Sequence, residues 1–258
     1  MLSASHTPTL RHLNKVPMVT AIFWLIKMMS TTVGETAADF LSADMSFGLA
    51  GTAAVTGALL AAALFAQIRA PRLIPWLYWV SVALVSVFGT LVTDIMTDTL
   101  GIPLPASTLG FGLALLCTFA VWYRQERTLS IQAIDSVKRE LFYWAAIFVT
   151  FAMGTASGDW IAEGLSLGYR NAVMLFAAAI AVTALAKWVF NANAIACFWV
   201  AYVLTRPLGA AFGDLLSQPL ANGGLGLGSV STSVVFVITI TGAIAYLSIR
   251  PQQPSGQA

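Results

Sequence analysis

Seven carboxylates in this sequence stand in or at the ends of long apolar stretches, where ionisable side chains are rare. Four of them recur at one position of an internal repeat: Asp39, Asp94, Asp159 and Asp214. The other three each lie four residues from one of these: Glu35, Asp98 and Glu163. Residues four apart share one face of an α-helix, so three copies present a pair of acids. The fourth copy has Gln218 at the partner position.

Oxygen ligands of this kind suit hard cations such as Mg²⁺, Mn²⁺ or Ca²⁺, and also protons. Ionisable groups deep in a bilayer cost about 2.5–3.5 kcal/mol each on insertion scales and usually face a bundle interior or an aqueous cavity. Four copies around one axis would gather their acids at a shared cavity. The alternative is that the Asp side chains cap helix ends near the membrane surface and serve only the scaffold.

Other site chemistries find little support. Both histidines are near the N-terminus, at His6 and His12, and the two cysteines, Cys117 and Cys197, form no CxxC pair. Intramembrane haem, zinc and copper sites usually rely on such residues. The sequence also lacks nucleophile motifs and cofactor fingerprints, so we expect neither an enzyme nor a resident cofactor, and no nucleic-acid partner.

Two cations accompany the acids inside the apolar stretches. Lys27 lies two helical turns before Glu35, and Arg206 is followed by Pro207, which is expected to disturb its helix. In one interpretation Lys27 and Arg206 gate the site, neutralising the acids until a cation or protons displace them. In the other, they form fixed ion pairs with Glu35 or Asp39.

The repeat is defined by an aromatic residue and Trp, a Gly ten residues after the Trp, and an Asp fifteen after it. The Trp residues lie 55, 65 and 55 residues apart, at Trp24, Trp79, Trp144 and Trp199. Copies one and three are therefore 120 residues apart, and copies two and four are separated by the same distance in sequence. This pattern indicates a duplication of a duplication.

Composition places these repeats in a membrane. Hydrophobic residues make up 58% of the chain, charged residues make up 9%, and the mean hydropathy is +0.81. Because about 20 apolar residues cross a bilayer, we predict an all-α integral membrane protein with eight transmembrane helices, two in each repeat. The expected spans are 17–42, 47–68, 73–98, 104–124, 140–166, 168–190, 194–217 and 227–249.

Each repeat would form a helical hairpin, and an even number of spans makes the four repeats parallel in the membrane. Ten of the thirteen Lys and Arg lie at the termini or after even-numbered spans, which predicts that both termini are cytoplasmic. The expected segments are a disordered tail (1–14), a first membrane half (15–125), an amphipathic cytoplasmic linker (126–140), a second membrane half (141–250) and a C-terminal tail (251–258).

Two further features of the repeat bear on packing. Four positions after each repeat Gly there is a small residue, or a Thr in one copy. This spacing favours close approach of helices. The first members of these pairs are Gly34, Gly89, Gly154 and Gly209. The aromatic–Trp pairs are typical of anchors at the membrane surface.

The strings KVPMVTAIFWLIKMMSTTVGETAADFLS (15–42), TLSIQAIDSVKRELFYWAAIFVTFAMGTASGDW (128–160) and ANAIACFWVAYVLTRPLGAAFGDLLS (192–217) resemble a family of bacterial "uncharacterised membrane-anchored proteins" built from this fourfold repeat. The resemblance covers nearly the whole chain. It implies the repeat architecture and a bacterial inner membrane, and it implies no activity.

The residues themselves favour a transporter of a small cation, with a divalent metal such as Mn²⁺ as substrate and protons as a counter-ion. Asp39, Asp94, Asp159 and Asp214 would supply metal ligands or proton sites, assisted by Glu35, Asp98 and Glu163. Two alternatives stay open at this point. A carrier of an organic cation or metabolite would line its site with the repeat Trp residues, and a non-transporting scaffold would tolerate loss of the acids. The sequence leaves open whether the protein is a homo-oligomer.

Overall fold

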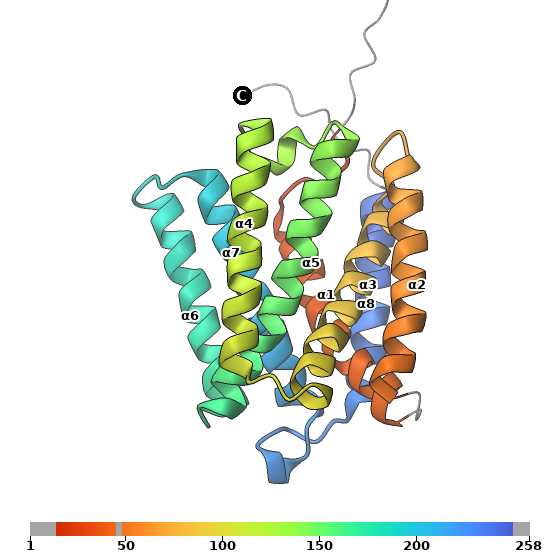
Figure 1. The fold of residues 1–258 in the computed structure, drawn as a ribbon, viewed down its shortest axis with the longest axis vertical. Coiled ribbons are helices and arrows are strands. Elements are labelled where there is room, and N and C mark those ends of the chain that lie inside the picture. The colour runs from red at the N-terminus through yellow and green to blue at the C-terminus, as the bar shows by residue number, and fades with distance from the viewer. Residues whose placement is uncertain (1–13, 45–47, 250–258) are drawn as a thin grey trace, which may run out of the picture.

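A computed structural model describes residues 14–44 and 48–249 of the chain. Within these ranges it contains eight α-helices and no strand (Figure 1). This confirms the all-α class and the two helices per repeat. The predicted tails at 1–14 and 251–258 fall, apart from residue 14, outside the described residues. The helices are α1 Ala21–Asp39, α2 Gly48–Arg69, α3 Pro75–Asp94, α4 Leu104–Glu126, α5 Val137–Asp159, α6 Tyr169–Trp188, α7 Ala194–Ser217 and α8 Ser229–Ile249.

Seven of the eight described helices, α2 to α8, are long and apolar enough to cross a membrane, as expected of a multi-pass membrane protein. The eighth described helix, α1, is not among them, so the prediction of eight spans is supported for seven helices. That helix carries Lys27 and Glu35, and twelve of its 19 residues are buried, including four Ser and Thr side chains from Ser30 to Thr36. Because its polar groups face other helices, α1 is surrounded by protein to a degree that the lipid-facing helices are not.

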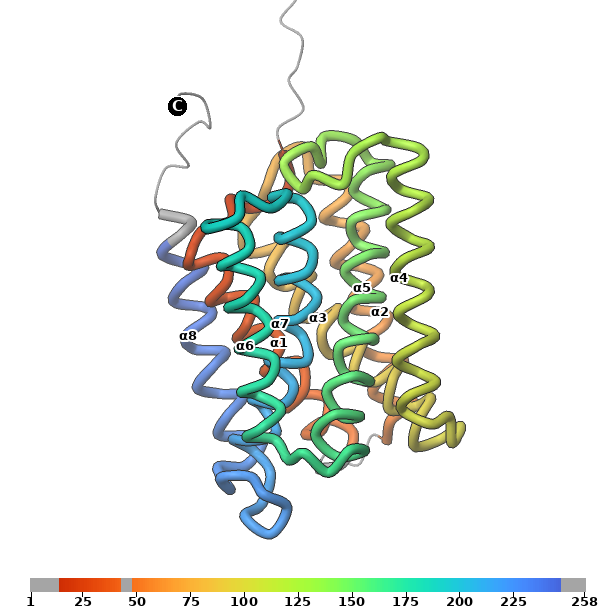
Figure 2. The backbone as a smooth tube through the Cα atoms, turned by 90° about the vertical axis from the view of Figure 1, so that its left-hand side faces the viewer, coloured from red at the N-terminus to blue at the C-terminus, as the bar shows by residue number. Residues whose placement is uncertain are grey.

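The first helices of the four repeats form the centre of the bundle. Helices α1, α3, α5 and α7 pack in a closed ring, with α1 against α3, α3 against α5, α5 against α7, and α7 against α1. The second helices lie outside this ring and are mostly exposed (Figure 2). The axis of the ring is therefore lined by the helices that carry the repeat Asp residues.

The predicted hairpins do not pack as units. Among the described residues, α2 packs on α3, α4 on α5, α6 on α7, and α8 mainly on α1. Each outer helix thus contacts the central helix of the next repeat, and the last one returns to the first. The two helices of one repeat are joined in sequence but make few contacts with each other.

Three central helices end in a π-helical turn that begins directly after the repeat Asp. These turns are Phe40–Asp44, Ile95–Thr99 and Trp160–Gly164. The backbone N–H of Leu100 donates to the carbonyl of Ile95 (3.0 Å) and that of Leu165 to Trp160 (2.8 Å), a five-residue spacing. The wider turn rotates later residues away from the face expected for an α-helix. In the fourth repeat, α7 continues as an α-helix to Ser217.

The aromatic–Trp pairs are core residues, so their prediction as membrane-surface anchors is wrong. Trp79, Trp144 and Trp199 are all buried and belong to one cluster that fills the ring near the N-terminal ends of the central helices. The hydroxyls of Tyr78 and Tyr143 hydrogen-bond to each other within it. Aromatic rings of neighbouring central helices contact one another there, as Tyr78 of α3 and Trp144 of α5 do.

The segment between the halves, predicted as an amphipathic cytoplasmic linker, packs some of its apolar side chains against the bundle. It forms a short 3₁₀ turn at Ile131–Ala133, and Ile131 and Ile134 are buried in the aromatic cluster. At the start of α5, the buried Glu140 accepts hydrogen bonds from Lys15 (2.8 Å) and Gln67 (3.2 Å). This network fastens the beginning of α1 and the end of α2 to α5.

The repeat glycines allow the close approach that the sequence predicts. A Cβ atom on Gly34 would overlap the side chain of Ser86 on α3, and one on Gly209 would overlap Thr31 on α1. A Cβ on Gly154 would overlap Arg206 on α7. The glycines therefore hold the ring of central helices at its spacing.

Substituting Gly34→Ala should destabilise the bundle, because the added methyl must displace Ser86, whose backbone carbonyl carbon lies 3.0 Å from the new Cβ. Overpacking of this kind costs about 1–3 kcal/mol. We expect a lower midpoint of thermal unfolding in detergent. Gly110→Ala on α4 is the matched control, since a Cβ there has no neighbour within 4 Å. Equal midpoints for the two variants would contradict the close-approach interpretation.

Candidate cation site

A cavity of about 650 Å³ lies at the C-terminal ends of the four central helices. Every acid predicted for the site lines it: Glu35, Asp39, Asp94, Asp98, Asp159, Glu163 and Asp214. Gln218, the neutral partner in the fourth repeat, lines it too. The repeat register thus brings the seven carboxylates, which are spread over 180 residues of sequence, to one place.

Exposure of the acids falls from the rim of the cavity to its floor. Asp98 and Glu163 are exposed, whereas Asp94 and Asp159 are partly buried. Glu35 is 5% exposed. Charged oxygens therefore extend from solvent to the interior of the ring.

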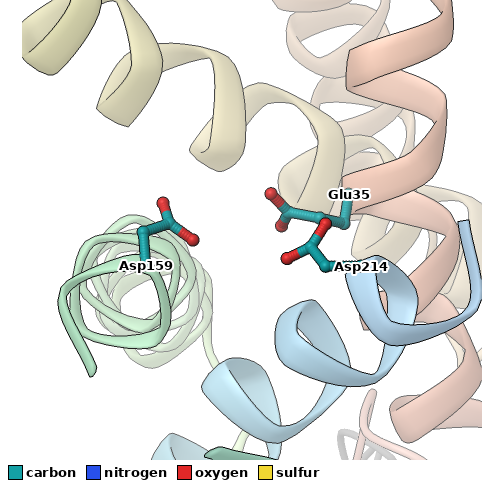
Figure 3. A group of neighbouring side chains, drawn as sticks. All are labelled: Glu35, Asp159 and Asp214. Carbon is teal, nitrogen blue, oxygen red and sulfur yellow. The ribbon is translucent and has the colours of Figure 1, made fainter. Parts of the chain in front are cut away.

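Three carboxylates converge at the floor of the cavity. Single oxygens of Glu35, Asp159 and Asp214 all lie within 4.8 Å of one another. They come from α1, α5 and α7 and point toward a common space (Figure 3). One cation with metal–oxygen distances of about 2.0–2.6 Å could contact all three oxygens after small side-chain adjustments.

Only two of the four Asp residues expected as metal ligands belong to the converging group. Asp159 and Asp214 belong to the converging group, where Glu35 joins them. Asp39 and Asp94 line the same cavity without belonging to that group. Glu35 lies one turn before Asp39 on α1 and takes the place in this group that Asp39 was predicted to hold.

Arg206 closes the floor of the cavity on the side that faces the interior of the bundle. Its guanidinium is fully buried, and Nη2 donates to Glu35 Oε2 at 2.9 Å and to Thr155 Oγ1 at 2.6 Å. Nη2 also donates to Thr90 Oγ1, and Nη1 donates to the carbonyl of Thr31 at 3.3 Å. One side chain of α7 is therefore bonded to α1, α3 and α5. The arrangement contains the ion pair with Glu35 that the sequence offered as one interpretation.

Pro207 does not break its helix as expected. Helix α7 continues from Ala194 to Ser217 through this residue. Pro207 packs against the glycine face of α5, where Gly154 and Gly158 leave room for its ring. The proline therefore contributes to close packing beside Arg206 and lies outside the cavity lining.

Lys27 lies away from the acids. Its side chain is fully buried, and its Nζ is 4.2 Å from the ring centroid of Phe151 and 4.3 Å from that of Tyr202. Within the described part of the chain, Nζ has no hydrogen-bond partner. Two aromatic faces, rather than carboxylates, surround this ammonium.

The sequence analysis missed Thr90 and Thr155, the hydroxyls that hold Arg206. Both stand four residues before a repeat Asp, at the position that Glu35 occupies in the first copy. Superposing the repeats would have placed them beside Glu35. Ser42 and Thr97, which line the cavity, were also missed. Each follows a repeat Asp by three residues, whereas the sequence analysis considered only acids four residues away.

The repeat Trp residues do not reach this cavity. Its lining within the described residues contains none of Trp24, Trp79, Trp144 and Trp199. They belong to or pack against the aromatic cluster near the other end of the central helices. The aromatic lining expected for an organic-cation carrier is therefore absent from the site that holds the acids.

Comparison with known proteins identifies the repeat itself. A family model described as a Repeat of Unknown Function (DUF347) matches residues 22–72, 77–128, 142–193 and 197–252. These four matches coincide with the four copies defined by the Trp, Gly and Asp pattern, which confirms the fourfold repeat. No curated protein and no solved structure matches the chain.

Breaking the pair between Arg206 and Glu35 from one side should destabilise the fold strongly. Either Arg206→Met or Glu35→Gln leaves a buried group without its partner, a loss of about 3–5 kcal/mol in comparable cases. The double variant removes both groups and should recover part of that loss. Thermal unfolding of the three variants in detergent measures this coupling. Additive losses in the double variant would show that the two side chains act independently.

Proposed function

Because the chain belongs to the Repeat of Unknown Function (DUF347) family, whose description names no activity, we propose a function from the cavity itself. The protein is a membrane transporter of a small cation, and its substrate is a divalent metal such as Mn²⁺. The observation that carries this proposal is the convergence of Glu35, Asp159 and Asp214 on one space at the floor of a cavity lined by seven acids.

The charges at the floor favour a divalent ion. When all three are deprotonated, the carboxyl groups carry three negative charges, and the adjacent Arg206 carries one positive charge. The remaining two negative charges match one divalent cation. Carboxylate oxygens are the ligands that hard divalent metals prefer, and a cation bound there would relieve the repulsion between oxygens held within 4.8 Å of one another.

The gradient of exposure supports an entry route. A cation would meet Asp98 and Glu163 at the rim, pass Asp94, and reach Glu35 at the floor. Acids arranged in this order raise the local cation concentration at the mouth of the cavity. Release to the other side requires the floor to open, since the Arg206 network and then the aromatic cluster lie beyond it.

The floor could open at the boundary between the two halves of the duplication. Arg206 belongs to the second half of the duplication, and its partners Glu35 and Thr90 belong to the first. Rocking of the two halves against each other would separate these groups, as occurs when repeats form a site at their interface. In this mechanism Arg206 pairs with Glu35 in the absence of metal and yields that carboxylate when a cation arrives.

The distribution of Lys and Arg supports an orientation in a bacterial inner membrane with both termini in the cytoplasm. The four repeats then enter from the same side, and the acid cavity faces outward. Protons are the proposed counter-ion, because a carboxylate that loses a metal can take up a proton in its place.

A scaffold without transport is the second candidate, and the number of bonds made by Arg206 favours it. In that function the Glu35–Arg206 pair is permanent and the acids serve stability alone. The two candidates differ in the effect of neutralising an acid that Arg206 does not bond, such as Asp159.

Asp159→Asn should abolish divalent-cation flux while the protein stays folded, because an amide lacks the charge needed beside Glu35 and Asp214. Flux of Mn²⁺ into proteoliposomes measures this, with monodispersity in detergent as the check on folding. Asp135→Asn is the control, since Asp135 is an exposed acid in the segment before α5. Undiminished flux in the Asp159 variant would remove the proposal, and competition by organic cations would redirect it to that substrate class.

Mn²⁺ should raise the thermal stability of the purified wild-type protein, because a ligand that binds only the folded state stabilises it. At a concentration about 100 times Kd the gain is about 2.7 kcal/mol. Asp214→Asn, at the floor, should lose the shift, whereas Asp98→Asn, at the rim, should keep most of it. The comparison uses K⁺ at equal ionic strength. A shift of the same size in both variants would place the binding site elsewhere.

A further inference from the structure

Lys27 is a buried cation that the acid cavity does not explain. It carries no exposed surface, and among the described residues its three N–H donors have no acceptor. Contacts with the rings of Phe151 and Tyr202 offset part of the cost of burying the charge, by about 2 kcal/mol for a desolvated pair. A buried ammonium normally also has a counter-ion or hydrogen-bond acceptors, so another role has to account for this residue.

The groups that contact Lys27 come from α5 and α7. Helix α7 contributes the ring of Tyr202, α5 contributes the ring of Phe151, and the guanidinium of Arg206 lies over the same Phe151 ring. Helix α8, which also packs on α1, has no acidic or basic residue within its described range. The carboxylate nearest along α1 is Glu35, which is bonded to Arg206. Lys27 therefore stands beside a fixed guanidinium without an anion of its own.

The position of Lys27 on the axis joins the two ends of the ring. It precedes Glu35 by eight residues, a rise of about 12 Å along α1. Toward the cavity, Phe151 contacts both Lys27 and Arg206 through its ring. Toward the other end, Tyr202 leads into the cluster that contains the hydrogen-bonded pair of Tyr78 and Tyr143.

The surroundings of Lys27 suit a proton and exclude a larger ion. The side chain is enclosed by packed rings and helices, so a metal has no space at Nζ, whereas a proton needs none. Between the levels of Lys27 and Glu35, the hydroxyls of Ser30, Ser86 and Thr150 are buried and have no hydrogen-bond partner among the residues that the structure describes. A hydroxyl group can both donate and accept a hydrogen bond, as a group that relays a proton must.

We propose that Lys27 is the proton-binding site that couples metal movement to proton counterflow. This inference rests on the proposed transport function. In each cycle the ammonium of Lys27 releases one proton on one side of the membrane, and the resulting amine takes one proton from the other side. Lys27 forms no bond to the metal, which stays with the carboxylates, and the coupling is through charge on the shared axis.

The test uses full-length protein in liposomes that contain a trapped pH indicator. Wild-type protein should move protons when a Mn²⁺ gradient is imposed, and a pH gradient should drive Mn²⁺ against its own gradient. Lys27→Met should reduce both coupled movements to the level of protein-free liposomes. The same variant should keep the thermal shift caused by Mn²⁺, which a merely structural loss would also remove.

Lys27→Arg provides a second variant should Lys27→Met fail to fold, because arginine keeps the charge and does not release its proton. It should lose coupled proton movement as well. Lys187→Met on α6 is the control for loss of one positive charge far from the axis. Absence of Mn²⁺ flux in the wild-type protein would overturn the transport function and this inference together. Flux without proton movement, or proton movement that survives in either Lys27 variant, would overturn this inference alone.

Discussion

One buried guanidinium holds the centre of this protein together. Arg206 on α7 bonds Glu35 and the Thr31 carbonyl on α1, Thr90 on α3 and Thr155 on α5. Nη1 and Nη2 of this buried charge donate to these partners, so loss of the Glu35 carboxylate would leave the guanidinium uncompensated. The same bonds fix the floor of the acid cavity and set the depth at which Glu35 meets Asp159 and Asp214. Fold and site therefore depend on one network.

This network exists because the four repeats have diverged where they meet. At the position seven residues after the repeat Trp, the copies carry Thr31, Ser86, Phe151 and Arg206. At the position eleven after it, they carry Glu35, Thr90, Thr155 and Ala210. Four identical repeats would place four like groups around the axis at each of these positions. Electrostatic repulsion opposes this arrangement when the groups are charged. A single Arg and a single Glu, with hydroxyls and a small residue between them, resolve this conflict, while the Asp layer is kept in every copy at the wider, solvated end.

Much of the architecture could be predicted from sequence, because hydrophobic length and repeat spacing are local properties. The eight helices and the seven acids that gather in the cavity follow from them. The packing of each outer helix on the next repeat could not be predicted, since the choice among lipid-facing neighbours depends on side-chain fit in three dimensions. Trp79 and Trp199 were misplaced because indole rings suit both a membrane surface and a packed core. The π turns after Asp39, Asp94 and Asp159 were not predicted because no residue preference marks them.

The bond between Glu35 and Arg206 also has a consequence for how the protein is made. The two residues are 171 positions apart, so at about 5–20 residues per second the ribosome needs about 10–30 s to supply the partner of Glu35. During that interval Glu35 lacks the guanidinium with which it pairs in the folded protein, so α1 cannot make this bond until α7 has been synthesised. The floor of the cavity can therefore close only late in the synthesis of the chain.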